Sequence, residues 1–155
     1  MKHIKLTQGK RTIVDDGDFD WLNQYRWCFS QGYACRGIYD AKTQKTHIIQ
    51  MQRFIMNTPK GMETDHKNRN TLDNRRENLR LCNKIQNQGN RTATAISGYK
   101  GVYWHQKMKK WEASFCKNYK KIYIGLFEKK EDAAKAYNKA ALEYYGEFAR
   151  LNEFN

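Results

Sequence analysis

The chain has 155 residues, enough for one ordinary domain or for two small domains with modest cores. Its 29 Lys and Arg residues outnumber its 16 Asp and Glu residues, and the formal net charge is +13. The aromatic content of 14% and the single proline argue against a disordered chain. Because the segments 1–59, 60–96 and 97–155 are each net positive, we expect a polyanion-facing surface along the whole molecule.

Cysteine usage and hydropathy bear on metal content and location. The four cysteines form no C-x-x-C pair and no Cys/His spacing typical of zinc sites, so we expect no structural zinc. The sequence has no leader-like segment and no long apolar run. These features predict a cytoplasmic protein with reduced thiols and no membrane partner.

The N-terminal third shows the short alternating patterns of β-strands. Residues 4–14 predict two strands that turn at Gln8-Gly9. The acidic run 15–18 lacks the closing Glu of a calcium loop, so it predicts a solvated turn in which Asp18 caps a short helix. The pattern then predicts further strands within 25–39 and 46–51 and a turn of helix at 53–56.

Residues 62–91 are polar and rich in Asn and Arg, with few apolar anchors. A segment this polar cannot form a large core, so we expect hydrogen bonds and metal to hold it. Short strands near 63–66 and 79–81, followed by a helix that begins near Asn83, predict a compact ββα unit.

After a small, polar segment at 92–98 the pattern changes to three strands and one helix. In the second strand Trp111, Ala113 and Phe115 point to one side. The helix spans about 129–145 and is rich in alanines, which allow it to lie close to the sheet. One sheet face is therefore expected to be buried, and the other to be basic and aromatic.

Asp65, His66 and Asn87 combine a carboxylate, an imidazole and a carboxamide within a run of arginines. A hard cation such as Mg²⁺ prefers the oxygen ligands, while a neutral imidazole accepts a proton at cellular pH. A backbone-bonded turn histidine and a surface amide on a helix are the plain alternatives for His66 and Asn87. The joint spacing favours a metal-dependent nuclease centre instead.

Two stretches resemble known families. Residues 64–90, with the sequence TDHKNRNTLDNRRENLRLCNKIQNQGN, resemble the HNH homing endonucleases of phages and introns. This resemblance implies Asp65 and Asn87 as metal ligands, His66 as general base and Asn78 as the asparagine that ties the loop. It also implies Mg²⁺ as cofactor, with Mn²⁺ as the alternative, and the host cytoplasm as location if a phage encodes the protein. The expected phosphate contacts are Arg53, Arg75, Arg76 and Arg80, of which Arg80 is alternatively a structural residue at a strand end.

The segment from Ser97 to Asn152 resembles the AP2 DNA-binding domain through Tyr99-Lys100-Gly101-Val102, Lys110-Trp111-Glu112-Ala113 and Ile124-Gly125-Leu126-Phe127. Further matches are the helix from Asp132 to Asn138 and the terminal run from Gly146 to Asn152. The resemblance implies duplex DNA as partner, and no protein partner is evident. Few arginines stand at the matching positions, which predicts lower or different base specificity. The DNA-contacting residues that it implies are Lys100, Tyr103, His105, Ser114, Lys121 and Tyr123.

Together these features predict an α+β fold. It consists of a β-rich segment leading into an HNH ββα-metal core, then an AP2-like three-stranded antiparallel sheet packed on one C-terminal helix. The predicted divisions are a β-rich and nuclease region at 1–91 with its core at about 47–91, a linker at 92–98 and a DNA-binding domain at 99–155.

One departure from the family pattern bears on activity. Members of the HNH family usually carry a His-Arg pair upstream of the core, whereas here Gln52 precedes Arg53. Glutamine cannot be protonated or act as a base. The sequence therefore predicts a site-specific, metal-dependent DNA endonuclease of the homing type, with a non-cleaving DNA-binding regulator as the main alternative. An RNA-binding module is a weaker alternative, because the AP2-type sheet and helix suit duplex DNA.

Overall fold

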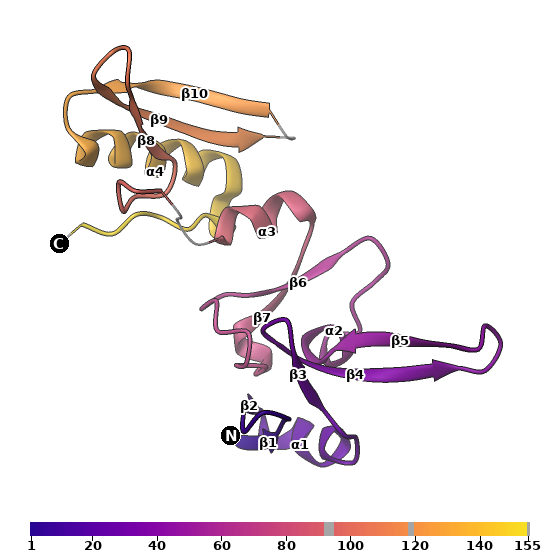
Figure 1. Cartoon of the computed structure of the whole chain (residues 1–155). Coiled ribbons are helices and arrows are strands. Elements are labelled where there is room, and N and C mark those ends of the chain that lie inside the picture. The colour runs from indigo at the N-terminus through magenta and orange to yellow at the C-terminus, as the bar shows by residue number, and fades with distance from the viewer. Residues whose placement is uncertain (92–94, 118–119, 155) are drawn as a thin grey trace. The chain divides into compact units, whose positions relative to one another are not determined.

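The computed structural model describes residues 1–91, 95–117 and 120–154. The chain divides into two compact units, Met1–Asn83 and Lys84–Asn155 (Figure 1). Small antiparallel sheets and a long C-terminal helix confirm the predicted mixture of helices and strands. The predicted 92–98 linker lies partly outside the described residues, and the predicted domain boundaries stay predictions.

The N-terminal unit begins with a hairpin of β1 (Lys2–Lys5) and β2 (Arg11–Val14), followed by helix α1 (Asp16–Asn23). The prediction that Asp18 caps this helix is wrong. Asp15 occupies the N-cap position, without a side-chain capping bond to any described residue. Because the helix begins at Asp16, Asp18 lies inside its first turn. The Asp18 carboxylate accepts from the Trp21 indole nitrogen at 3.0 Å and from the Arg76 guanidinium.

A three-stranded antiparallel sheet follows, made of β3 (Cys28–Ser30), β4 (Tyr33–Asp40) and β5 (Lys45–Gln50). Figure 1 shows β4 and β5 as a long hairpin, which leads into helix α2 (Met51–Ile55). The core of the unit lies where these elements meet the first hairpin and α1. Its fully buried apolar members are Val14, Leu22, Ala34 and Met51.

The third part of the N-terminal unit is a two-stranded sheet of β6 (Glu63–His66) and β7 (Leu79–Cys82). The loop between these strands contains a short 3-10 turn, η1 (Arg76–Asn78). Strand β2 holds this loop through its backbone. The Ile13 amide donates to Leu72 O at 2.8 Å, and Ile13 O accepts from the Asn74 amide at 2.8 Å. The N-terminal hairpin therefore fixes the loop that joins β6 to β7.

The C-terminal unit begins with helix α3 (Lys84–Asn90). Its sheet consists of β8 (Val102–His105), β9 (Lys110–Lys117) and β10 (Lys120–Phe127) in the order β8-β9-β10. Helix α4 (Lys130–Tyr145) lies along one sheet face, and a short 3-10 turn, η2 (Gly146–Phe148), follows it (Figure 1). Ala133 and Ala134 are fully buried against Val102 and Ala113 of the sheet. Small side chains on both elements allow this close packing.

Four residues from other parts of the C-terminal unit contact helix α3. A Cβ atom added at Gly89 would lie 2.8 Å from Phe148 O and 2.9 Å from the Tyr145 ring, so only glycine fits there. The Arg150 amide donates to Gly89 O at 2.9 Å. The Lys100 ammonium donates to Gln88 O at 3.3 Å and also to Gly89 O. Helix α3 therefore folds as part of the unit that carries the β8–β10 sheet.

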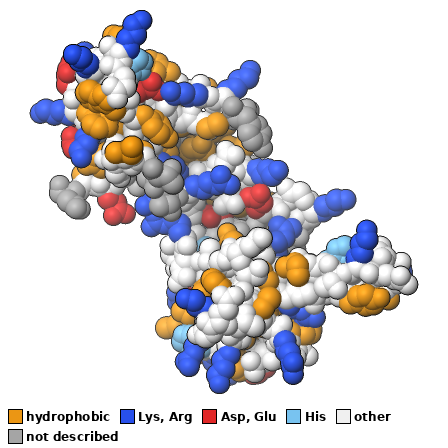
Figure 2. All heavy atoms as spheres, viewed as in Figure 1, with side chains coloured by type: hydrophobic (Ala, Val, Ile, Leu, Met, Phe, Trp, Pro, Cys, Tyr) orange, Lys and Arg blue, Asp and Glu red, His pale blue; other side chains and the backbone are white. Residues whose placement is uncertain are grey.

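Lys and Arg side chains are spread over both units on the face that Figure 2 shows, with few acidic side chains between them. This distribution follows from the excess of basic residues in every segment of the sequence. Within the part of the chain that the structure describes, no helix is long and apolar enough to cross a membrane.

Candidate active site

His66 is the last residue of β6, and only 4% of its surface is exposed. Its Nε2 lies 3.1 Å from Asn74 Oδ1. Burial lowers the pKa of His66 and outweighs the Asn74 hydrogen bond and the nearby carboxylate charges, which raise it. The imidazole is therefore neutral at neutral pH, and a neutral imidazole is able to accept a proton.

Asp65 precedes His66 on β6 and is 6% exposed. Its Oδ2 accepts from Arg80 Nε at 2.9 Å and lies 2.8 Å from Arg80 Nη2. The two residues are direct cross-strand partners, which brings the guanidinium to the carboxylate without bending either strand. Arg80 thus balances the charge of the carboxylate that the family resemblance implies as a metal ligand. Its predicted phosphate contact stays a prediction.

Asn78 joins the two ends of the loop between β6 and β7. Its Oδ1 accepts from the Asn68 amide at 2.9 Å, and its Nδ2 donates to Asp73 O at 2.8 Å. The side chain is 6% exposed, so water does not compete for these bonds. These contacts are of the kind that a loop-tying asparagine needs.

The neighbouring arginines are bound to carboxylates of the same unit. Arg75 donates from Nε and Nη2 to both carboxylate oxygens of Asp73 at 2.7 Å. Arg76 pairs in the same way with Asp18 at 2.7 and 2.8 Å. The Arg75 hydrogen bonds hold the pKa of Asp73 below its ordinary value, against the effect of burial. Both guanidinium groups therefore stabilise the β6–β7 loop through ion pairs within the unit. Their predicted phosphate contacts stay predictions.

Arg53, the remaining arginine predicted to contact DNA, lies on α2 and donates from Nη1 to Met62 O at 2.9 Å. The preceding Gln52 is 2% exposed. Gln52 Nε2 donates to Gln50 Oε1 at 3.0 Å, while its own Oε1 is buried without a hydrogen-bond partner among the described residues. Gln52, which precedes Arg53 where the family usually has a histidine, is thus a buried amide. The sequence did not predict this burial.

The candidate residues are divided between the two units. Asp65, His66 and Asn78 lie together in the N-terminal unit, whereas Asn87 is half-buried on α3 of the C-terminal unit. The place of Asn87 beside Asp65 stays a prediction. No sequence pattern indicated that this helix folds with the C-terminal sheet.

The two residues that the family resemblance implies as metal ligands, Asp65 and Asn87, both carry oxygen donors. No group of three or more His, Cys, Asp or Glu side chains arranged for a metal occurs in the described ranges 1–91, 95–117 and 120–154. Mg²⁺ is usually bound by only one or two carboxylates, together with waters and substrate phosphates. The Asp65 carboxylate and the Asn87 amide oxygen have the hard-ligand chemistry for such an ion.

Asn74 and Thr12 contact the site, and no sequence pattern assigned either residue a role. Both are fully buried, and Asn74 Nδ2 donates to Thr12 Oγ1 at 2.8 Å. Asn74 lies within the stretch that resembles the HNH family, so its carboxamide was a usable signal. Thr12 is separated from Asn74 by 62 residues, and only the fold brings it to the site.

The outer face of the C-terminal sheet carries most of the predicted DNA-contacting residues. Tyr103 and Tyr123 are 52% and 58% exposed, whereas Ser114 is buried. Lys121 Nζ lies 2.6 Å from the buried Glu112 carboxylate, and this hydrogen bond holds the pKa of Glu112 below its ordinary value. An ion pair and two exposed tyrosine rings thus lie on a face that was expected to be simply basic and aromatic.

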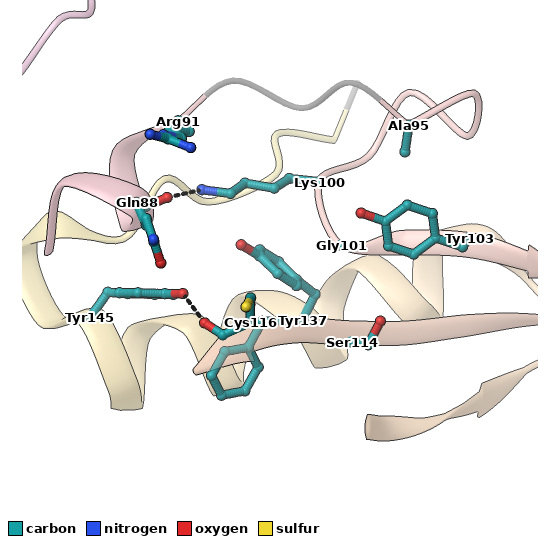
Figure 3. Close-up of a pocket in the computed structure, with 11 residues that line it drawn as sticks. Gln88, Arg91, Ala95, Lys100, Gly101, Tyr103, Ser114, Cys116, Tyr137 and Tyr145 are labelled. Atoms are coloured by element: carbon teal, nitrogen blue, oxygen red, sulfur yellow. Dashed lines mark hydrogen bonds between the residues drawn. The ribbon is translucent and has the colours of Figure 1, made fainter. Parts of the chain in front are cut away.

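The remaining two residues predicted to contact DNA, His105 and Lys100, make hydrogen bonds within the C-terminal unit. His105 Nδ1 accepts from the Met108 amide at 3.3 Å, in the turn after β8. Lys100 lines a pocket of about 300 Å³ with Gln88, Tyr103, Tyr137 and Tyr145, drawn in Figure 3. There its ammonium reaches the carbonyl end of α3, as the dashed line to Gln88 shows. Lys100 therefore stabilises the end of this helix, where a positive charge is favourable.

Comparison with known proteins identifies the family of the chain. Residues 45–88 match the HNH endonuclease family model, and residues 97–147 match the AP2 domain model. An uncharacterized HNH endonuclease of Acanthamoeba polyphaga mimivirus is 31% identical over 156 residues, which cover 97% of this chain and 80% of that protein. The chain therefore belongs to the HNH endonuclease family.

A second relative is a transcription factor. An ethylene-responsive transcription factor of Arabidopsis thaliana is 34% identical over 70 residues, which cover 44% of this chain and 16% of that protein. Both resemblances predicted from the sequence, to HNH endonucleases and to AP2 domains, are thus confirmed. No solved structure matches the chain significantly.

Proposed function

We propose that this protein is a site-specific, divalent-metal-dependent DNA endonuclease of the homing type. The observation that carries the proposal is the buried, neutral His66 next to Asp65, at the end of a strand whose loop is tied by Asn78. A general base needs a fixed position and a neutral ring at cellular pH. His66 has both properties, and membership of the HNH family supplies the reaction class.

In the proposed reaction His66 accepts a proton from the water that attacks the scissile phosphodiester. Asp65 and Asn87 would hold the cation, with Mg²⁺ preferred. When bound, the ion would polarise the phosphate and stabilise the departing 3′ oxygen. Arg80 orients the Asp65 carboxylate through its Nε and Nη2 contacts with Oδ2.

Site choice is assigned to the C-terminal sheet acting on duplex DNA. Tyr103, Lys121 and Tyr123 present their side chains on the outer face of this sheet, opposite α4. Such a face can contact base edges and phosphates together. The excess of basic residues in both units supplies the sequence-independent part of the affinity.

The test is cleavage of a supercoiled plasmid that carries the DNA flanking the gene's insertion point, in Mg²⁺ and in EDTA. Nicked and linear products separate on one gel. His66→Ala should lower the cleavage rate by roughly 10²–10⁴-fold, because the general base is lost. DNA binding should be unchanged in a gel-shift assay, and His3→Ala, at an exposed histidine of β1, is the matched control. Near-normal cleavage by His66→Ala contradicts the proposed role of this residue.

The second candidate function is a DNA-binding regulator that does not cleave. The observation that favours it is Gln52, a buried amide at the position where the family resemblance implies a histidine. The same plasmid assay decides between the two functions. Specific binding without Mg²⁺-dependent nicking, at any enzyme concentration that saturates the site, would favour the regulator.

A further inference from the structure

We propose that Thr12 and Asn74 form a buried hydrogen-bond relay that fixes the tautomer and the orientation of His66. In this relay the ring proton of neutral His66 lies on Nε2, and the lone pair lies on Nδ1. The tautomer itself follows from the hydrogen bonds alone. Only the use of the Nδ1 lone pair to accept the proton of water rests on the proposed function.

The direction of the relay is set at Thr12. Its Oγ1 lies 2.8 Å from Leu72 O, and a carbonyl oxygen can only accept. The single hydroxyl proton of Thr12 is therefore committed to Leu72. Oγ1 has only its lone pairs to offer Asn74, so the atom of Asn74 that lies 2.8 Å away must be the Nδ2 donor.

This contact determines which way the Asn74 amide faces. With Nδ2 directed at Thr12, the Oδ1 atom is directed at His66 Nε2, at 3.1 Å. An amide oxygen cannot donate, so the proton between these atoms belongs to His66 Nε2. A neutral imidazole carries one ring proton, which leaves the lone pair on Nδ1.

Burial makes the alternative arrangement unfavourable. Thr12 and Asn74 are fully buried, and His66 is 4% exposed. If the Asn74 amide turned over, its oxygen would face the Thr12 lone pairs and its NH₂ group would face His66. The Asn74 and Thr12 oxygens would then face each other with no proton between them and no water to replace the lost donor.

The backbone holds the relay at both ends. Ile13, next to Thr12 on β2, donates to Leu72 O at 2.8 Å and accepts from the Asn74 amide at 2.8 Å. Leu72 O therefore keeps a backbone donor even when the Thr12 hydroxyl is absent. These bonds make the N-terminal hairpin a part of the nuclease site, although it lies outside the residues 45–88 that match the family model.

The relay matters because it decides which ring nitrogen of His66 carries the lone pair. Nε2 faces the interior amide of Asn74. A lone pair on Nε2 would therefore be directed at the protein interior, where no attacking water can reach it. Thr12 and Asn74 are thus positioning residues, which act on the reaction through His66.

The test uses two substitutions of one residue outside the reacting groups. Thr12→Val has nearly the same shape but no hydroxyl, so it releases the Asn74 amide and allows both tautomers. Thr12→Ser keeps the hydroxyl and is the matched control. We expect Thr12→Val to lower the single-turnover cleavage rate by about 10–100-fold. Thr12→Ser should cleave at nearly the wild-type rate, and both variants should bind the plasmid DNA as the wild type does.

The deciding measurement is the ¹⁵N NMR spectrum of the His66 ring, which a merely structural role of Thr12 would not change. The His66 signals are assigned by their absence from the spectrum of His66→Ala. In the wild type the spectrum should show the Nε2–H tautomer, and in Thr12→Val a mixture of both. An Nδ1–H tautomer in the wild type overturns the relay, even if Thr12→Val fails to fold. An unchanged tautomer and rate in a folded Thr12→Val protein overturns it as well. If the wild type shows the Nε2–H tautomer but does not cleave, the relay stands and the proposed function fails.

Discussion

The loop between β6 and β7 and the contact between α4 and its sheet are both buried, but different groups fill them. In the loop the buried side chains are polar, with Asp73, Asn74 and Asn78 at 6% exposure or less. Between α4 and its sheet they are alanines and aromatic rings, with Ala133 and Ala134 fully buried and Tyr137 2% exposed. Directional hydrogen bonds hold the β6–β7 loop, whereas close packing of side chains holds α4 against its sheet.

The difference shows what each kind of contact contributes. A protein hydrogen bond adds only about 1 kcal/mol net, because the unfolded chain bonds to water instead. Its direction, however, fixes the angle of a side chain, as the two bonds of Asn78 do for the loop. Close packing contributes stability but tolerates no extra volume. We therefore expect substitutions in the loop to affect cleavage more than stability, and substitutions under α4 to do the reverse.

The largest effect on stability is expected for Gly101→Ala, in the turn before β8. A Cβ atom there would lie 2.1 Å from the Tyr137 ring and 2.7 Å from Ser114 O, at a φ of +74°. Overpacking and the left-handed backbone together should cost about 3 kcal/mol of unfolding free energy. Gly98→Ala is the control, because its φ is +79° but nothing lies within 4 Å. Equal losses in denaturant unfolding of the two variants would contradict the role assigned to packing.

A smaller loss of stability is expected for Asn78→Ala, in the polar loop. Losing both side-chain bonds should cost roughly 1–2 kcal/mol of unfolding free energy. The cleavage rate should fall by more than this loss of folded protein explains, because the loop no longer fixes the end of β6. Asn23→Ala, at the exposed end of α1, should change neither quantity. A variant that melts earlier yet cleaves normally when folded would show that the loop bonds do not position the site.

The smallest effect on stability is expected when the pH is lowered. The Arg75 hydrogen bonds lower the pKa of Asp73 below the ordinary value of 3.8, against the effect of burial, so the unfolded chain takes up protons first as pH falls. The stabilisation by this carboxylate is therefore complete well above pH 3.8 and is lost as pH falls below it. Hydrogen exchange of peptides from the β6–β7 loop should rise in this window, and Asp73→Asn should flatten the rise. An unchanged pH profile in Asp73→Asn would exclude this carboxylate as the cause.

Regular patterns made much of the fold predictable. Strand β6 was expected at 63–66 and spans Glu63–His66, and the helix expected at about 129–145 spans Lys130–Tyr145. Both elements are set by local features, an extended run in the first case and alanine-rich periodicity in the second. The Asp18 cap was predicted from equally local reasoning and was wrong, because the helix begins at Asp16 with Asp15 at the N-cap. The partner of Asp18, Arg76, lies 58 residues away in the sequence and could not be predicted locally.

The site was predictable only in part, for the same physical reason. The residue types Asp65, His66 and Asn78 were evident because they fall within one short stretch. The ion pairs of Arg75 and Arg76 depend on which carboxylates the fold brings near, and for Arg76 the partner comes from another element. The contact of Asn74 with Thr12 spans 62 residues and has no local signature. Local spacing thus indicates chemistry, while side-chain orientation depends on tertiary structure.

The binding of α3 within the C-terminal unit has a consequence for how such genes recombine. Gly89 fits against Phe148 and Tyr145, and the carbonyl end of the helix receives the Lys100 ammonium. An exchange of DNA-binding modules at residues 92–98 would separate this helix from the residues that hold it. A crossover between Asn83 and Lys84 would transfer it together with them. A protein that changes its DNA target by exchanging this module would then receive the β8–β10 sheet together with α3, the helix that carries Asn87.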